Sequence, residues 1–233
     1  MEQSGRNILD RIVIATAPSV TSQVYDWMRE RVLRGELAPG ARLSETEIAG
    51  AIGVSRQPVR EAFIRLASDG LAEVRPQRGT YIGKISVAAV LSARLIREAV
   101  ESDLARMVAA DPPVEMLARM AEEIALQERA DAEGAVEAFI DSDDRFHRLL
   151  ATGARQEAVW HDLEKLKSQM NRLRHMSMRA FDRAGTIGQH RDILEALRRR
   201  SPDAAERAVR AHLRQMLDEL PRIAARHPDF FTD

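Results

Sequence analysis

The sequence predicts a mainly α-helical protein: an N-terminal winged helix-turn-helix with a small β wing, followed by an all-α bundle of six or seven helices. Three observations predict this architecture. Two short helical periods separated by the tight turn AIGVS occupy residues 45–66. Strand-like runs around the turn PQRG follow in residues 71–85. Beyond Ser86 the strand signals stop, and only helical periods divided by glycine and proline remain. We expect an N-terminal arm over residues 1–19, the winged domain over 20–85 and the helical domain over 86–233.

Composition narrows the class of protein. The chain has 233 residues, enough for two modest domains, and its 35 basic residues nearly balance its 36 acidic ones, so a general polyanion binder is not indicated. Cysteine is absent, which excludes disulfides and thiolate metal sites and is compatible with the cytoplasm, where we expect the protein. The apolar stretch IVIATA is far too short to cross a membrane, so we expect no membrane partner.

The first expected helix runs from Thr21 to Arg34, where apolar residues recur with a helical period, and it ends at Gly35. The segment GELAPGARLS that follows is rich in glycine and proline, which indicates a loop with one short extended piece. A short helix from Glu45 to Ile52 comes next, with Ser44 as its N-cap.

Pro58 fixes the start of the following helix, because proline is tolerated only in the first turn. The helix from Arg56 to Leu66 therefore begins just before Pro58, and we expect the Ser55 hydroxyl to cap it. Two short helices across such a turn form a helix-turn-helix, whose second helix can enter a major groove of DNA. The stretch LAEVRPQRGTYIGKI then predicts a hairpin wing with Arg78 at its tip, either contacting DNA or forming an ordinary solvated turn.

The rest of the chain predicts an antiparallel helical bundle with short connections. Glycine and proline residues mark the breaks between its helices. The expected helices span residues 87–110, 113–131, 134–152, 155–181, 186–200 and 203–226.

Within this bundle, three histidines and one carboxylate share faces with apolar residues. Asp143 and His147 lie one helical turn apart, while His190 and His212 belong to the last two helices. Imidazole and carboxylate groups pointing inward together make a site for zinc, nickel, manganese or iron; the alternative is that each histidine is an ordinary core residue. The other histidines are expected on solvated faces or in the tail: His161, His175 and His227.

The stretch GELAPGARLSETEIAGAIGVSRQPVREAFIRLASDGL, followed by the RGTYI wing, resembles the winged helix-turn-helix of GntR-type bacterial transcription regulators. The helical remainder resembles the ligand-binding FCD domain of the FadR subfamily, which implies that residues 86–233 form an effector-binding and dimerisation domain. The resemblance implies a homodimeric, ligand-responsive regulator, a repressor and not an enzyme, on a palindromic operator. The residues that it implies contact operator DNA are Thr46, Ser55, Arg56, Gln57, Arg60, Arg78 and Gly79.

The same resemblance implies a divalent metal ion in the effector cavity, with zinc the first candidate. The implied ligands are Asp143, His147, His190 and His212. The family's RxxxE pattern appears as Arg97 and Glu101, which implies that Arg97 faces the carboxylate of a small effector; a plain structural bridge between the two residues is the alternative. Asn171 and Arg172 are further candidates for lining the cavity.

Other readings of the bundle stay open. A count of six helices favours the VanR-like branch of the family over the seven-helix FadR type, and the metal set argues against an acyl-CoA effector. Metal sites with open coordination also activate water, so a metalloenzyme is a rival, although no general base is evident beside the four ligands. A third reading makes the metal itself the signal.

Overall fold

The computed structural model describes residues 19–232, which form two compact units. The second unit spans Ala88–Arg226, and the first holds the described residues up to Val87 together with those from His227 onward. The tail joins the first unit because strand β5 (Phe231–Thr232) pairs in parallel with β4 (Ile85–Ser86). The helical domain therefore ends before the tail, and the expected range 86–233 is too long at its C-terminal end. Residues 1–18 of the predicted arm lie outside the described part of the chain.

The first unit is a winged helix-turn-helix, as the sequence predicts. A three-stranded antiparallel sheet of order β1-β3-β2 packs beside three helices, with Val24, Val59 and Leu66 in their shared core. Ala72 of β2 pairs with Ile82 of β3, and Arg42 of β1 pairs with Tyr81. The elements are α1 (Val20–Leu33), β1 (Arg42–Leu43), α2 (Glu45–Ile52), α3 (Arg56–Ser68), β2 (Ala72–Arg75) and β3 (Gly79–Ile82).

The two helices of the motif differ in how their N-termini are capped. The Ser44 hydroxyl accepts a hydrogen bond from the backbone N–H of Glu47, at 3.3 Å. Ser55 occupies the corresponding position before α3, but its side chain makes no capping hydrogen bond. An N-cap side chain bonds the N–H of the second or third helical residue, and the third residue of α3 is Pro58, which has none. The predicted cap is therefore wrong in its hydrogen bond, and the Ser55 hydroxyl is left exposed.

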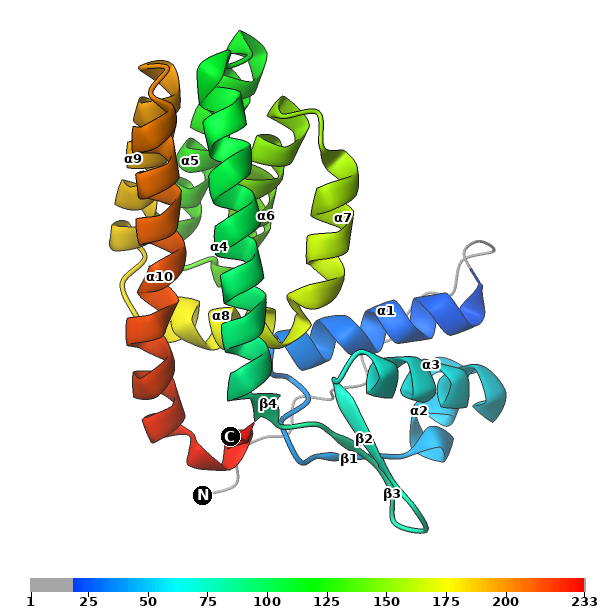
Figure 1. The fold of residues 1–233 in the computed structure, drawn as a ribbon. Coiled ribbons are helices and arrows are strands. Elements are labelled where there is room, and N and C mark those ends of the chain that lie inside the picture. The colour runs from blue at the N-terminus through cyan, green and yellow to red at the C-terminus, as the bar shows by residue number, and fades with distance from the viewer. Residues whose placement is uncertain (1–18, 233) are drawn as a thin grey trace. The chain divides into compact units, whose positions relative to one another are not determined.

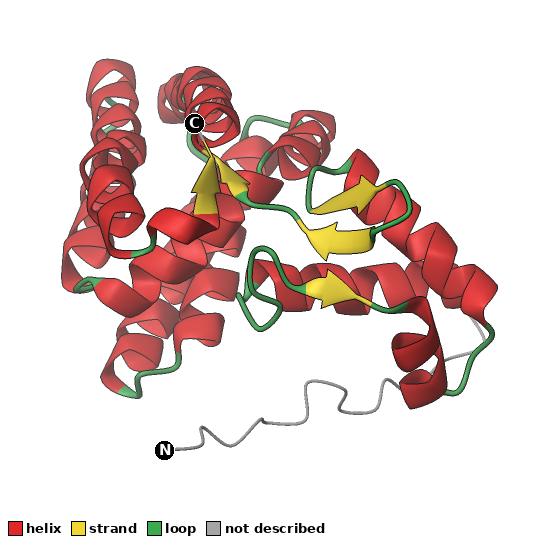
Figure 2. Ribbon diagram, turned by 90° about the horizontal axis from the view of Figure 1, so that it is seen from below, coloured by secondary structure: helices red, strands yellow, loops and turns green. Residues whose placement is uncertain are grey.

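The second unit is an all-α bundle. Figures 1 and 2 show long helices side by side and one helix, α8, crossing near one end of the bundle. Among the described residues the bundle has seven helices, and none is long and apolar enough to cross a membrane. They are α4 (Val87–Ala110), α5 (Val114–Ala132), α6 (Val136–Gly153), α7 (Glu157–Leu166), α8 (Ser168–Ala180), α9 (Ala184–Arg198) and α10 (Pro202–Arg226).

The predicted helix 155–181 is two helices that meet at Lys167. Neither glycine nor proline marks this break. Lys167 is instead buried, and its ammonium lies 2.9 Å from an oxygen of Asp144 on α6. The six-helix count was wrong, and with it the argument for the VanR-like branch.

Candidate metal centre and nucleic-acid interface

Three imidazoles converge inside the second unit, from α6, α9 and α10. The Nε2 atom of His212 lies 3.1 Å from Nε2 of His147 and 3.3 Å from Nε2 of His190. The carboxylate of Asp143 completes the group, with its oxygens 3.7 Å and 3.6 Å from Nε2 of His147 and His190. One ligand atom from each of the four residues fits within 4.8 Å of all the others. The structure therefore brings together all four residues of the predicted metal set.

Each histidine ring has an oxygen at its other nitrogen. Nδ1 lies 2.7 Å from Gln127 Oε1 in His190 and 2.8 Å from Gln189 Oε1 in His212. In His147 the partner is a carboxylate oxygen of Glu101, at 2.7 Å. The two amide oxygens only accept, so the ring proton of His190 and of His212 belongs on Nδ1, and the Nε2 atoms of both rings present a lone pair to the same point.

The charge state and spacing of this group suit a divalent metal ion. Burial lowers the pKa of His190 and of His212 well below the usual value, and neighbouring histidines add to the effect, so both rings are neutral, as ligation requires. Facing lone pairs repel unless a cation lies between them. A tetrahedral zinc site with Zn–N bonds of about 2.0–2.1 Å separates its ligand nitrogens by roughly 3.3 Å, close to the spacing seen here.

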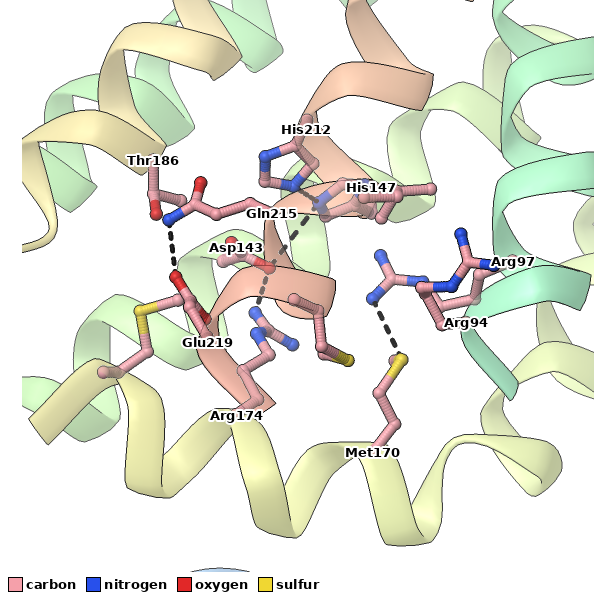
Figure 3. A pocket seen from close by; sticks show the side chains of 13 residues that line it. Arg94, Arg97, Asp143, His147, Met170, Arg174, Thr186, His212, Gln215 and Glu219 are labelled. Carbon is pink, nitrogen blue, oxygen red and sulfur yellow. Dashed lines mark hydrogen bonds and ion pairs between the residues drawn. The ribbon is translucent and has the colours of Figure 1, made fainter. Parts of the chain in front are cut away.

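A small cavity adjoins this centre (Figure 3). Asp143, His147 and His212 form part of its wall, and about 50 Å³ of it is open to the centres of water molecules, room for a small ligand. Arg97 and Arg174 also line the cavity, so it combines metal-ligating groups with cationic side chains. Asn171 and Arg172, which the sequence placed at this wall, are buried on other faces of α8 and do not line it. Met170 and Arg174, one helical turn apart, line the wall in their place.

Arg97 forms the structural bridge that the sequence left as an alternative. Its guanidinium donates two hydrogen bonds to the carboxylate of Glu101, one of them from Nη2 at 3.2 Å. Burial alone would raise the pKa of Glu101, but Arg97 and His147 hold it well below its usual range. Glu101 therefore stays charged and links Arg97 to the ring of His147. The sequence reasoning did not assign Glu101 this second contact.

Arg174 is a site residue that the sequence reasoning missed. It is buried, and its guanidinium donates to Asp143 and, at 2.8 Å, to Asp144. Figure 3 shows the side chain reaching from α8 to Asp143. His175, expected on a solvated face, is also buried, with Nδ1 3.4 Å from Glu137. Both residues lie in the segment whose helix break had no signal in the sequence.

The first unit carries a second candidate site, a groove between α2, α3 and the wing. It is lined by Thr46, Arg56, Arg60 and Gly79, four of the residues predicted to contact DNA. Both arginines bind one carboxylate of Glu45: Arg60 through two hydrogen bonds of 3.0 Å and Arg56 through one of 3.0 Å. The hydrogen bonds from Arg60 and Arg56 lower the pKa of Glu45, so this carboxylate stays ionised and holds the two guanidinium groups side by side.

The remaining predicted DNA contacts lie around this groove. Ser55, Gln57 and Arg78 are exposed, and Gln57 donates to Glu61 at 3.0 Å. Arg42, which was not predicted, also lines the groove. A Cβ atom on Gly79 would lie 3.4 Å from the Arg42 guanidinium, and the backbone φ of +104° at Gly79 favours glycine. Glycine at this position therefore leaves room for the Arg42 guanidinium at the base of the wing.

A helix-turn-helix with an arginine pair at its helix start, joined to a helical bundle with a ligand-sized cavity, defines a DNA-binding transcription regulator with a sensor domain. Residues 20–82 match the bacterial regulatory proteins of the gntR family, and residues 93–215 match the FCD domain. The chain belongs to the GntR family of bacterial regulators, in the FadR-like subfamily that carries FCD domains. This family consists of transcriptional regulators, so the chain is not an enzyme, and the metalloenzyme reading is set aside.

Relatives and solved structures agree with this assignment. The HTH-type transcriptional repressor RspR of Escherichia coli strain K12 is 37% identical over 218 residues, which cover 92% of this chain and 94% of the relative. A GntR transcriptional regulator from Rhodococcus sp. RHA1 has a TM-score of 0.72 at 25% identity and covers 88% of this chain and 99% of its own. Escherichia coli McbR/YncC shares the fold, with a TM-score of 0.74 at 22% identity and the same coverage.

Proposed function

We propose that this regulator is a homodimeric repressor on a palindromic operator, and that a small carboxylate binding in the helical domain changes its affinity for that operator. We further propose that each chain holds one divalent metal ion, preferably zinc, through Asp143, His147, His190 and His212. The observation that carries the proposal is the convergence of three imidazoles, with Nε2 of His212 3.1 Å and 3.3 Å from Nε2 of His147 and His190 and an oxygen beside the other nitrogen of each ring. The relative RspR is named a transcriptional repressor, which supports repression as the direction of regulation.

The residues of the cavity have separate roles in this proposal. A bound metal ion supplies a Lewis-acid centre for an effector oxygen. Gln127, Gln189 and Glu101 hold the three rings in place. Arg174 donates to Asp143, which is also a proposed metal ligand. A bound cation would neutralise the Asp143 carboxylate, and the Arg174 guanidinium could then bind the carboxylate of an effector. Arg97, already paired with Glu101, adds positive potential to the wall.

In the DNA-binding domain, Glu45 holds the Arg56 and Arg60 guanidinium groups beside the start of α3 until DNA takes its place. An arginine there can bind guanine O6 and N7 as a fork or grip a phosphate. Ser55, Gln57 and Thr46 lie near enough in sequence to add contacts at the same helix end, while Arg42, Arg78 and the backbone at Gly79 face the DNA from the wing side. A single helix-turn-helix contacts too few base pairs to specify an operator, so two copies on a palindrome supply the sequence specificity.

The test compares His190→Ala with wild type and with His161→Ala, which removes an exposed histidine from α7. We expect wild type and His161→Ala to carry one metal ion per chain by elemental analysis, and His190→Ala to carry little. Calorimetry with small mono-, di- and hydroxycarboxylic acids should show binding only to the two metal-loaded proteins. Equal metal content in all three proteins would reduce these histidines to core residues.

The same samples separate an effector-responsive regulator from a metal sensor. Operator affinity is measured by anisotropy with and without metal in the absence of any acid. If metal alone changes operator affinity and no acid does, the metal is the signal.

A further inference from the structure

One charged side chain in the wall of the cavity has no oppositely charged partner. Most charged groups of this wall form ion pairs inside the protein. The pairs are Arg94 with Glu98, Arg97 with Glu101, and Arg174 with Asp143. Glu219 of α10 is the exception, because no basic side chain among the described residues forms an ion pair with its carboxylate. This carboxylate is therefore available to pair with a group of the effector.

Two neutral donors hold the Glu219 carboxylate in place. The Ser177 hydroxyl on α8 donates to Oε2 at 2.5 Å, and Nε2 of Gln215, one turn earlier on α10, donates to Oε1 at 2.6 Å. A carboxylate has about four lone-pair sites, so roughly two remain for a further donor. The alternative role for Glu219 is to tie α10 to α8, but an uncharged acceptor would do this without the cost of removing a charge from water.

Glu219 lies apart from the metal ligand and the arginines of α4. His212, Gln215 and Glu219 follow one face of α10 at spacings of three and four residues. The helical rise places Glu219 about 10 Å along the axis from His212. Figure 3 shows Glu219 and Gln215 across the cavity from Arg94 and Arg97. The cavity thus presents metal-ligating and cationic groups in one part of its wall and an anionic group in another.

The apolar part of the wall suits a short carbon chain. It consists of Met170, Met178, Leu213 and Met216. Methionine is flexible and polarisable, so these side chains adapt to an aliphatic ligand. A molecule with a carboxylate at one end, a short chain and a hydrogen-bond donor at the other end complements all three parts of the wall.

We infer that Glu219 is a specificity-determining residue, which selects effectors that carry an ammonium or hydroxyl group far from their carboxylate. The inference rests on the carboxylate effector of the proposed function and adds the second group of that effector. An acid without a distal donor leaves the Glu219 carboxylate unpaired in the closed cavity. A diacid binds worse still, because its second carboxylate lies against that of Glu219.

The test measures this selectivity by calorimetry on the full-length chain supplied with zinc. Glu219→Gln is compared with wild type and with Glu164→Gln, which changes an exposed carboxylate on α7. The ligands form two matched sets: butanoate, 4-hydroxybutanoate, 4-aminobutanoate and succinate, then hexanoate, 6-hydroxyhexanoate, 6-aminohexanoate and adipate. In at least one set, wild type and Glu164→Gln should bind the hydroxy or amino acid about 10- to 100-fold more tightly than the unsubstituted acid and the diacid.

Glu219→Gln should lose most of this preference, and its affinity for the diacid should rise. Glu219→Lys reverses the charge and should reverse the preference, so the diacid becomes the best ligand of its set. Thermal unfolding of all four proteins shows which variants are folded, and either folded variant suffices for the comparison. A larger loss for the amino acid than for the hydroxy acid identifies ammonium as the preferred donor.

Two kinds of failure are distinguishable. If wild type binds the unsubstituted acids or the diacids as tightly as the donor-bearing acids, or if Glu219→Gln keeps the wild-type preference, the role of Glu219 is overturned while the carboxylate effector stands. If no acid of either set binds to wild type, the carboxylate effector fails and this inference fails with it.

Discussion

Gln127 tests whether the histidine rings are oriented for a metal. Its side chain is fully buried, and Oε1 lies 2.7 Å from Nδ1 of His190. Gln127→Met keeps the length of the side chain and removes the acceptor. The ring of His190 is then free to move its proton to Nε2 or to rotate. Loss of such a supporting contact lowers metal affinity by about 10- to 100-fold, equivalent to roughly 1.4–2.8 kcal/mol.

The stability of the metal-free protein should change less. An unpaired buried Nδ1–H costs about 1–3 kcal/mol. The substitution also removes Nε2 of Gln127, a buried amide nitrogen that has no hydrogen-bond partner in the structure, and this offsets part of the cost. We therefore expect a modest fall in the melting temperature without metal and a larger fall with it.

Competition with a chromophoric chelator measures the affinity, and thermal unfolding measures stability with and without zinc. Gln189→Met should give a similar loss, because Gln189 holds His212 in the same way. Gln156→Met, at an exposed position before α7, is the matched control. Wild-type metal affinity in Gln127→Met would refute the idea that these amides orient the rings.

Three further predictions concern the DNA-binding domain. Glu45→Gln should raise affinity for an unrelated duplex at low salt by up to about tenfold, because Arg56 and Arg60 no longer have to give up a carboxylate partner before they bind phosphate. Unchanged affinity in anisotropy titrations would contradict this. Arg78→Ala should lower the salt slope of binding by about one unit on every sequence, and a sequence-dependent loss would show base contact instead. Burial and the hydrogen bond to Asp69 raise the pKa of Tyr25 to about 12. An unfolded tyrosine ionises near pH 10, so folding stability should be full below about pH 10 and fall as the pH rises towards 12. Tyr25→Phe should flatten that decline in thermal melts, and parallel curves for the two proteins would count against it.

Local rules explain most of the first unit. Pro58 fixes the start of α3 to the residue, and glycine and proline punctuate the loop and the wing. The capping bond of Ser55 does not form, and the same proline removes one of the two backbone donors, that of the third helical residue, to which the hydroxyl could bond. Arg42 escaped notice because a two-residue strand has too little pattern to show which side chain faces the wing.

The bundle was harder to predict where tertiary contacts override local preference. At the break between α7 and α8, Lys167 forms an ion pair with Asp144 of α6, and no residue type signals the break in the sequence. The Asp143 and His147 pair could be found because both side chains lie on one helix. Glu101 and Gln127 come from α4 and α5, so their contacts with the rings appear only once the bundle is assembled.

Because β4 pairs with β5, the helical domain is inserted in the sequence of the DNA-binding domain. The chain leaves the DNA-binding domain after Ser86 and returns to it with Phe231, so both ends of the helical domain are anchored in the reader. A chimera that exchanges sensors between relatives by a single junction near residue 87 would carry a foreign β5 strand. Exchanges with two junctions, at 87 and 227, keep the DNA-binding domain intact.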